Sequence, residues 1–134
     1  ANETFPDNAR AYFHGYSTPA ALFEFYRTNP LDVFLNLSDT EGTPVSIMEA
    51  VSCAIPIIAT AVGGNVEIVS ERNGILLNSN PALEDIAAAL FFMIDRPAQA
   101  EEMRRGSREV WKMKYDADKN FRAFAEELAF IRSS

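Results

Sequence analysis

Short segments that are largely apolar on both faces alternate along this chain with segments of helical pattern. Two of them are clear: residues 32–37 read DVFLNL, and residues 56–60 read PIIAT. A strand that is apolar on both faces has to be covered on both, which is typical of a parallel sheet between two layers of helices. With right-handed crossovers such a sheet is doubly wound. The pattern therefore predicts a protein of the α/β class.

The other elements follow from capping and turn signals. We expect about four strands, at residues 11–14, 32–37, 56–60 and 75–77. Helices are expected at Thr18-Pro19, at Thr43-Pro44 and after a cap at Asn65, and three more close the chain at 81–94, 97–114 and 118–131. A complete sheet of this Rossmann-like type has six strands. The chain is therefore expected to be one domain, 1–134, that forms the second half of such a unit, with an α/β part in 1–95 and helices in 96–134.

Charge is distributed unevenly. The net charge is −7, and residues 1–103 hold four basic and fourteen acidic side chains, with no lysine. Residues 104–122 reverse the sign, with seven basic and three acidic side chains. A chain this acidic is not expected to bind nucleic acid. The basic stretch is either the solvated face of a helix or a contact with an anionic membrane surface.

The single cysteine, Cys53, excludes an internal disulfide and indicates a reducing compartment. We therefore expect a cytoplasmic protein, with peripheral contact at the inner face of the membrane as a second option. The chain does not begin with Met, so we expect it to be processed or part of something longer.

Two carboxylates stand eight residues apart after the strand at 32–37. Glu41 is expected in a loop at the carboxyl edge of the sheet, and Glu49 about one and a half turns into the next helix. The helix start offers unpaired N–H groups that suit phosphate or sugar hydroxyls. A carboxylate accepts hydrogen bonds only, so it suits paired hydroxyls such as those of a ribose or a hexose. The alternative is two solvated acids near a helix start, where negative charge is favourable in any case.

A longer motif surrounds these acids. It comprises Glu41-x7-Glu49, Ala50, Cys53, residues 55–60, Val62-Gly63-Gly64-x-x-Glu67 and residues 74–77, with Phe13-His14-Gly15-Tyr16 and residues 32–34 upstream. This pattern, over residues 9–95, resembles the C-terminal part of the family-four retaining glycosyltransferases of the GT-B fold. The resemblance implies a part that binds a UDP-, GDP- or ADP-sugar in an enzyme that moves a hexose to a glycan or lipid-linked acceptor. It also implies bacterial surface polysaccharide biosynthesis, with no metal and no cofactor.

The resemblance also implies a role for each matched residue. Glu41 would face the donor sugar near its anomeric carbon, as a positioning group or a nucleophile, and Glu49 would accept from the ribose hydroxyls. The backbone of Gly42, Thr43, Pro44, Val45 and Ser46 would offer N–H groups to the sugar and diphosphate, Ile47 would line the ribose pocket, and Gly15, Tyr16 and Ser17 would flank the base.

Three departures from the family pattern matter. The family neutralises the diphosphate with an upstream Arg and Lys, and residues 1–103 contain no Lys. The acceptor-binding N-terminal domain is missing. Ala54 stands where the family usually has Gly after the cysteine, which costs about 1 kcal/mol if the backbone is left-handed there. We therefore expect the chain alone to transfer no sugar and to bind nucleotide sugars in the millimolar range or worse.

Other residues invite a chemical interpretation beside a structural one. His14 is the single histidine, but a strand-end role is preferred over a general base, and Cys53 is preferred as a packing residue over a nucleophile. Asp116-Ala117-Asp118 spells a metal-binding D-x-D, yet its place between two helices favours capping. Glu67 is expected to support the site rather than contact substrate.

The last expected helix carries an apolar stripe with helical spacing, at Phe121, Phe124, Ala125, Leu128 and Ile131. We expect this stripe to be core. In a whole enzyme it would pack partly against the other domain, so the alternatives for this chain alone are an exposed face or a contact with a second copy. Two other functions also stay open: a noncatalytic module that binds a nucleotide or a partner protein, and a sugar epimerase of similar build. The length of the native gene product would discriminate between an enzyme and a stand-alone module.

Overall fold

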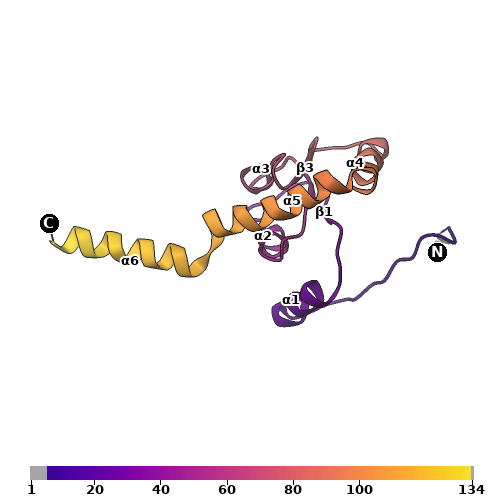
Figure 1. Cartoon of the computed structure of the whole chain (residues 1–134). Coiled ribbons are helices and arrows are strands. Elements are labelled where there is room, and N and C mark those ends of the chain that lie inside the picture. Colours follow the sequence, from indigo (N-terminus) through magenta and orange to yellow (C-terminus); the bar gives the residue numbers. More distant parts are fainter. Residues whose placement is uncertain (1–5, 134) are drawn as a thin grey trace.

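A three-stranded parallel sheet forms the centre of the computed structural model, which describes residues 6–133 (Figure 1). Its strands are β1 (Phe34–Asn36), β2 (Ile57–Thr60) and β3 (Gly74–Leu77), in the order β1-β2-β3. Phe34 lies opposite Ile57, and Ile57 lies opposite Gly74. The predicted α/β class and three of the predicted strands are confirmed.

Helices cover both faces of this sheet. The helices are α1 (Pro19–Thr28), α2 (Val45–Ser52), α3 (Asn65–Ile68), α4 (Leu83–Asp95), α5 (Pro97–Val110) and α6 (Ala117–Ser133), with a π-helical turn at Trp111–Tyr115. Those that supply buried side chains to the two faces of the sheet are α2, α3, α4 and α5. On β2, Ile57 and Ala59 pack into a core cluster with α2, α3 and the end of α5, whereas Ile58 packs on the other face with α4. The double-sided apolar pattern of this strand is therefore explained by two separate cores.

The strand predicted at residues 11–14 is wrong. This segment is irregular, and Tyr12 and Phe13 are 72% and 93% exposed. A strand forms only where a neighbour supplies hydrogen bonds. Within the part of the chain that is described, β1 pairs on one edge with β2, and no strand lies on its other edge. Residues 11–14 therefore have the composition of a strand, but no neighbouring strand pairs with them in the described part of the chain.

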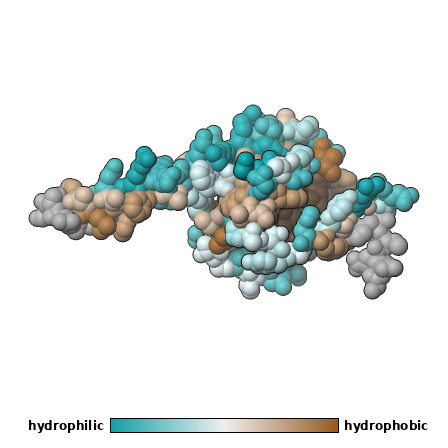
Figure 2. Space-filling view, turned by 90° about the horizontal axis from the view of Figure 1, so that it is seen from below, coloured by the Kyte–Doolittle hydropathy of each residue, from teal (hydrophilic) through white to brown (hydrophobic). Residues whose placement is uncertain are grey.

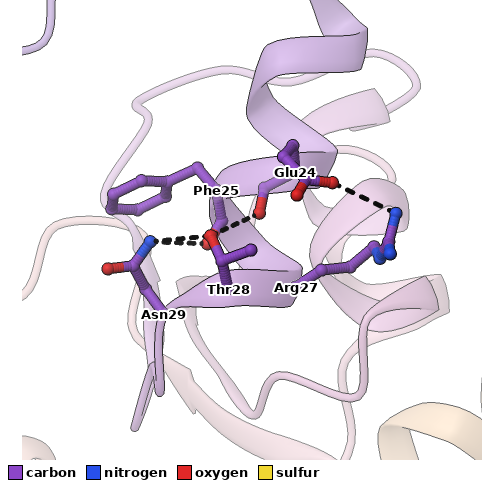
Figure 3. Close-up of polar contacts among 5 residues, drawn as sticks. All are labelled: Glu24, Phe25, Arg27, Thr28 and Asn29. Atoms are coloured by element: carbon purple, nitrogen blue, oxygen red, sulfur yellow. Dashed lines mark hydrogen bonds and ion pairs between the residues drawn. The ribbon is translucent and has the colours of Figure 1, made fainter.

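The first helix begins and ends where its sequence signals indicate. Thr18 caps it by accepting a hydrogen bond from the Ala21 N–H at 3.2 Å. At its end, Asn29 donates from Nδ2 to the Phe25 carbonyl at 3.0 Å, and Thr28 donates to the Glu24 carbonyl at 2.8 Å (Figure 3). The Phe25 carbonyl also accepts the Asn29 backbone N–H at 3.0 Å, so the side chain adds a second hydrogen bond to the last turn, just before Pro30.

Helix α6 projects from the body of the molecule (Figure 1). Phe121, Phe124 and Leu128 on this helix are 73%, 59% and 46% exposed, so the prediction that its apolar stripe is core is wrong, and the Ile131 side chain lies outside the described part. Figure 2 shows hydrophilic and hydrophobic residues on opposite sides of the helix. The chain turns at Asp116, whose Oδ1 accepts from the N–H groups of Asp118 and Lys119 at 3.1 and 3.2 Å. The predicted capping role of this motif is confirmed.

Several cations of the basic stretch 104–122 hold helix α5 and the π-helical turn against the domain. Arg104 donates to the Leu31 carbonyl at 2.7 Å, Arg108 donates to the Ser52 carbonyl at 2.7 Å, and Lys114 donates to the Glu67 carbonyl at 2.9 Å. Such charge-assisted bonds satisfy carbonyls at the ends of loops and helices. These three side chains therefore have structural partners.

Ala54 has φ +58°, and it is the one residue other than glycine with positive φ in the described range. We expect Ala54→Gly to raise the free energy of unfolding by about 0.5 to 1 kcal/mol, because the left-handed region is strained for alanine and free for glycine. Urea unfolding of the chain measures the change. The same substitution at exposed Ala88, inside α4, is the control and should lower stability by about 1 kcal/mol. An equal decrease in the free energy of unfolding for Ala54→Gly and Ala88→Gly would contradict the prediction.

Candidate functional site

Two loops meet at the carboxyl ends of β1 and β2. The Gly64 N–H donates to the Gly42 carbonyl at 3.1 Å. Gly63 has φ +48°, and a Cβ added to it would lie 1.7 Å from the carbonyl oxygen of Glu41. The backbone of one loop therefore lies directly on the backbone of the other. In open α/β sheets this edge is where ligands bind.

The side chain of Glu41 is held in place by the end of β1. Its Oε1 accepts from Asn36 Nδ2 at 3.2 Å and from Ser38 Oγ at 2.8 Å. The Ser38 carbonyl in turn accepts from Thr60 Oγ1 at 2.6 Å, which ties the loop to the end of β2. Both bonds to Glu41 end on the same oxygen, so Oε2 is the oxygen available to a ligand.

Glu41 lines a hollow of ≈ 400 Å³. The other lining residues come from four parts of the chain: Gly42, Thr43, Pro44 and Met48 around the start of α2, Gly63 and Gly64 in the second loop, Glu67 and Ile68 on α3, and Tyr115 on the π-helical turn. Burial, with a smaller effect of Glu67, raises the pKa of Tyr115. The hollow thus joins a carboxylate, a phenol and exposed backbone.

The start of α2 offers fewer N–H donors than predicted. The helix begins at Val45, its N-cap is Pro44 rather than the predicted Thr43, and no side chain caps it. Proline has no N–H, and the Val45 N–H donates to the Thr43 carbonyl at 2.9 Å. Among Gly42 to Ser46, the donors left are therefore those of Gly42, Thr43 and Ser46.

The side chain of Ile47 does not line a ribose pocket as predicted. It is 0% exposed and belongs to the core cluster beneath α2. A β-branched apolar residue at this point of the helix packs against the sheet, which removes it from any ligand. Only the backbone N–H of Ile47, in the first turn of α2, can face a ligand.

Glu49 does not line the hollow, and its charge lies near α1. This charge raises the pKa of the half-buried Tyr26, after the larger effect of burial. Tyr26 belongs to α1, so the Glu49 charge lies near that helix. The structure therefore places the two acids of the motif in separate environments.

Gly15, Tyr16 and Ser17 lie in the exposed segment before α1, and Tyr16 is 93% exposed. None of the three lines the hollow beside Glu41. His14 packs against Phe25, with ring centroids 5.1 Å apart, and takes no part in that hollow. The role predicted for residues 15–17 beside a nucleotide base therefore stays a prediction.

Sequence reasoning missed several residues that build the site. Asn36 and Ser38 hold Glu41, and a polar Asn in an otherwise apolar strand was the available signal. Asn65, predicted as a helix cap, is 0% exposed and instead donates from Nδ2 to the Thr60 carbonyl at 3.0 Å. Tyr115 carried no signal, because it reaches the site only through tertiary packing.

Neither a group of metal-binding side chains nor a membrane-spanning helix occurs in the described residues. No group of three or more His, Cys, Asp or Glu side chains in residues 6–133 could hold a metal ion. In the same part of the chain, no helix is long and apolar enough to cross a membrane.

We expect the free energy of unfolding to fall as pH rises above 10.0, because Tyr26 keeps its proton more tightly in the folded chain. Its pKa is raised by burial, then by Glu49 and Cys53. Below pH 10.0 the phenol is neutral in both states; above it the unfolded chain loses the proton first, which favours unfolding. Unfolding measured against pH should show a shallower fall for Tyr26→Phe. An unchanged slope, equal to that of the control Tyr12→Phe, would contradict the prediction.

The fold and the site together define a class of protein: a partial Rossmann-like domain of the GT-B type, with its ligand edge where the loops after β1 and β2 meet. Residues 7–110 match the family described as glycosyl transferases group 1. The chain belongs to this family.

Curated relatives agree with this assignment, and a solved structure has a similar fold. The O-antigen biosynthesis glycosyltransferase WbnH of Escherichia coli is 42% identical over 55 residues, which is 41% of this chain and 16% of the relative. The lipopolysaccharide core biosynthesis mannosyltransferase LpsB of Rhizobium meliloti (strain 1021) is 33% identical over 86 residues, 62% of this chain and 24% of the relative. The fold is similar to that of HepE from Anabaena in complex with UDP, with a TM-score of 0.66 and 22% identity over 73% of this chain and 27% of that one. The chain thus spans less than a quarter of these curated relatives.

Proposed function

We propose that this chain is the part of a retaining glycosyltransferase that binds the nucleotide-sugar donor. The complete enzyme would transfer a hexose from a UDP-, GDP- or ADP-sugar to a glycan or lipid-linked acceptor in bacterial surface polysaccharide biosynthesis. The observation that carries the proposal is the Glu41 carboxylate, which Asn36 and Ser38 hold through one oxygen at the edge of an open hollow. The relatives in O-antigen and lipopolysaccharide core biosynthesis support it.

Each part of the donor would meet a different part of the site. Glu41 accepts from a hydroxyl of the sugar and stabilises positive charge at the anomeric carbon as the bond to the diphosphate breaks. The N–H groups of Gly42, Thr43 and Ser46, at the start of α2, attract the diphosphate. Glu49 accepts from the ribose hydroxyls, and Gly15 to Ser17 flank the base.

This chemistry relies on position and electrostatics, and we propose no metal and no cofactor. The chain alone would bind the donor weakly and would not transfer the sugar, because residues 1–103 hold no lysine to neutralise the diphosphate. The complete protein would act in the cytoplasm. In residues 6–133, no hydrogen bond or ion pair engages the side chains of Arg105, Lys112, Lys119 and Arg122. We assign to these four side chains any contact with an anionic membrane.

Calorimetric titration of the complete gene product against UDP-, GDP- and ADP-sugars tests the proposal. One class of donor should bind, and transfer should be detected when a glycan acceptor is added. Absence of binding to every donor would refute it. Binding without transfer to any acceptor would instead support a noncatalytic nucleotide-binding module.

A further inference from the structure

The π-helical turn Trp111–Tyr115 brings a phenol into the hollow that Glu41 lines. Tyr115 is far from Glu41 in the sequence, and α5 delivers it across the domain. Glu67, on α3, lines the same hollow. The polar side chains around this space are therefore those of Glu41, Thr43, Glu67 and Tyr115. Of these four, the proposed function assigns a role only to the Glu41 carboxylate.

Several contacts hold Tyr115 in this position. Lys114 Nζ donates to the Glu67 carbonyl at 2.9 Å, which ties the π-helical turn to α3, and Asn120 Nδ2 donates to the Lys114 carbonyl at 2.9 Å. The Tyr115 side chain is half-buried and packs against the core cluster. Isolated π-helical segments frequently occur at functional sites, because the extra residue redirects side chains. The ring is therefore positioned rather than free.

The carboxylate of Glu67 stays available. Lys114 bonds to its backbone oxygen, and in the described residues no hydrogen bond or ion pair engages its side chain. Glu67 is exposed, so a ligand can reach it. A neutral phenol donates and accepts, whereas a carboxylate only accepts. Together they suit a pair of neighbouring sugar hydroxyls.

We propose, building on the proposed function, that Tyr115 and Glu67 bind the hydroxyls of the transferred sugar and determine which hexose the site accepts. Glu41 would act near the anomeric carbon, and this pair would recognise the configuration of the ring further from it. Epimeric hexoses differ in the direction of one hydroxyl. A site built to bond that hydroxyl discriminates strongly against a sugar that cannot offer it, because its polar groups are then left unpaired.

The phenol of Tyr115 is a hydrogen-bond donor in this role. Burial, and secondarily Glu67, favour the protonated phenol. A phenol already keeps its proton at neutral pH at its ordinary pKa of about 10, so the hydroxyl can donate a hydrogen bond there. A hydroxyl of the sugar can accept this hydrogen bond while it donates a hydrogen bond of its own to the Glu67 carboxylate.

The test uses the complete gene product with Tyr115→Phe and Glu67→Gln. Titrations with UDP, GDP and ADP alone are compared with UDP-glucose, UDP-galactose, GDP-mannose and ADP-glucose. In each variant we expect the dissociation constant of the matching nucleoside diphosphate to stay within about twofold of the wild-type value. The dissociation constant of the preferred sugar conjugate should rise about tenfold, which corresponds to the loss of one to two hydrogen bonds. The ratio of kcat/KM between the preferred sugar and its epimer should fall by a similar factor.

Matched controls are Tyr12→Phe, in the exposed N-terminal segment, and Glu71→Gln, outside the hollow. Both should leave the ratio unchanged. Because Tyr115 also packs against the core cluster, the midpoint of thermal unfolding of Tyr115→Phe is measured as well. Glu67 does not belong to that cluster, so Glu67→Gln tests the proposal separately from core packing. Equal loss of nucleotide and sugar-nucleotide binding, or an unchanged selectivity ratio in Glu67→Gln, would overturn the inference. If Glu41→Ala still lowers turnover in that case, the proposed function stands; if it does not, both fail.

Discussion

Turnover by the complete enzyme should fall about a hundredfold or more in Glu41→Ala, with a smaller change in the Michaelis constant for the donor. The carboxylate is held at the edge of the hollow by hydrogen bonds of 3.2 and 2.8 Å to one of its oxygens. A fixed negative charge beside the sugar stabilises the positive charge that develops as the bond breaks, so it acts in the transition state more than in the ground state. Removal of one preorganised group of this kind typically costs about 10²–10³ in turnover.

Steady-state kinetics with the donor varied at saturating acceptor measures this effect. Glu41→Gln is the matched variant, because its amide oxygen can still accept from Asn36 and Ser38 while the charge is lost; it should be as slow as alanine if charge is the cause. Glu49→Ala should instead raise the Michaelis constant about ten- to a hundredfold, since bonds to the ribose are equal in both states. If the two variants exchange these effects, the roles of the acids are reversed. If neither changes anything, the site is wrongly assigned.

Gly63→Ala is expected to lower the free energy of unfolding by about 2 to 4 kcal/mol, the sum of left-handed strain and overpacking. Gly63 has φ +48°, and the new Cβ would lie 1.7 Å from the Glu41 carbonyl oxygen. Backbone cannot rotate away as a flexible side chain can, so the loop after β1 has to move. Because that loop carries Glu41, donor binding should weaken together with stability.

Urea unfolding of the chain measures the stability, and titration of the complete enzyme with the donor measures the second effect. Gly42→Ala is the control for stability, because a Cβ there would meet nothing within 4 Å. It should change the free energy of unfolding by less than about 1 kcal/mol. Equal destabilisation by the two substitutions would show that the close approach of the loops is not the reason for glycine at residue 63.

The predicted elements that the structure confirms are those whose cause is local. Pro19 starts α1 after its Thr18 cap, and Asp116 caps α6. The apolar residues on both faces of β2 also predicted a strand covered on both sides. Successive side chains of a strand point to opposite faces, and in the structure each face has its own core. The loop that carries Glu41 follows from these elements, since the strand before it ends at Asn36.

The elements that were predicted wrongly depend on neighbours. Residues 11–14 have a strand composition but no strand beside them in the described part of the chain. The apolar stripe of α6 has the spacing of a core helix, yet Phe121 and Phe124 stay exposed. Periodicity records that a face is apolar, and it does not record whether anything in the chain is available to cover it.

The sequence by itself determined the α/β class, the order of the strands and helices that form, and the loop in which Glu41 stands. Only the tertiary structure decided that Ile47 is core, that Glu49 does not line the hollow and lies near Tyr26 of α1, and that Tyr115 and Glu67 share the hollow with Glu41. The reason is physical: capping, turn conformation and side-chain alternation act between residues close in the chain, whereas the walls of a site are brought together by packing between elements that are distant in it.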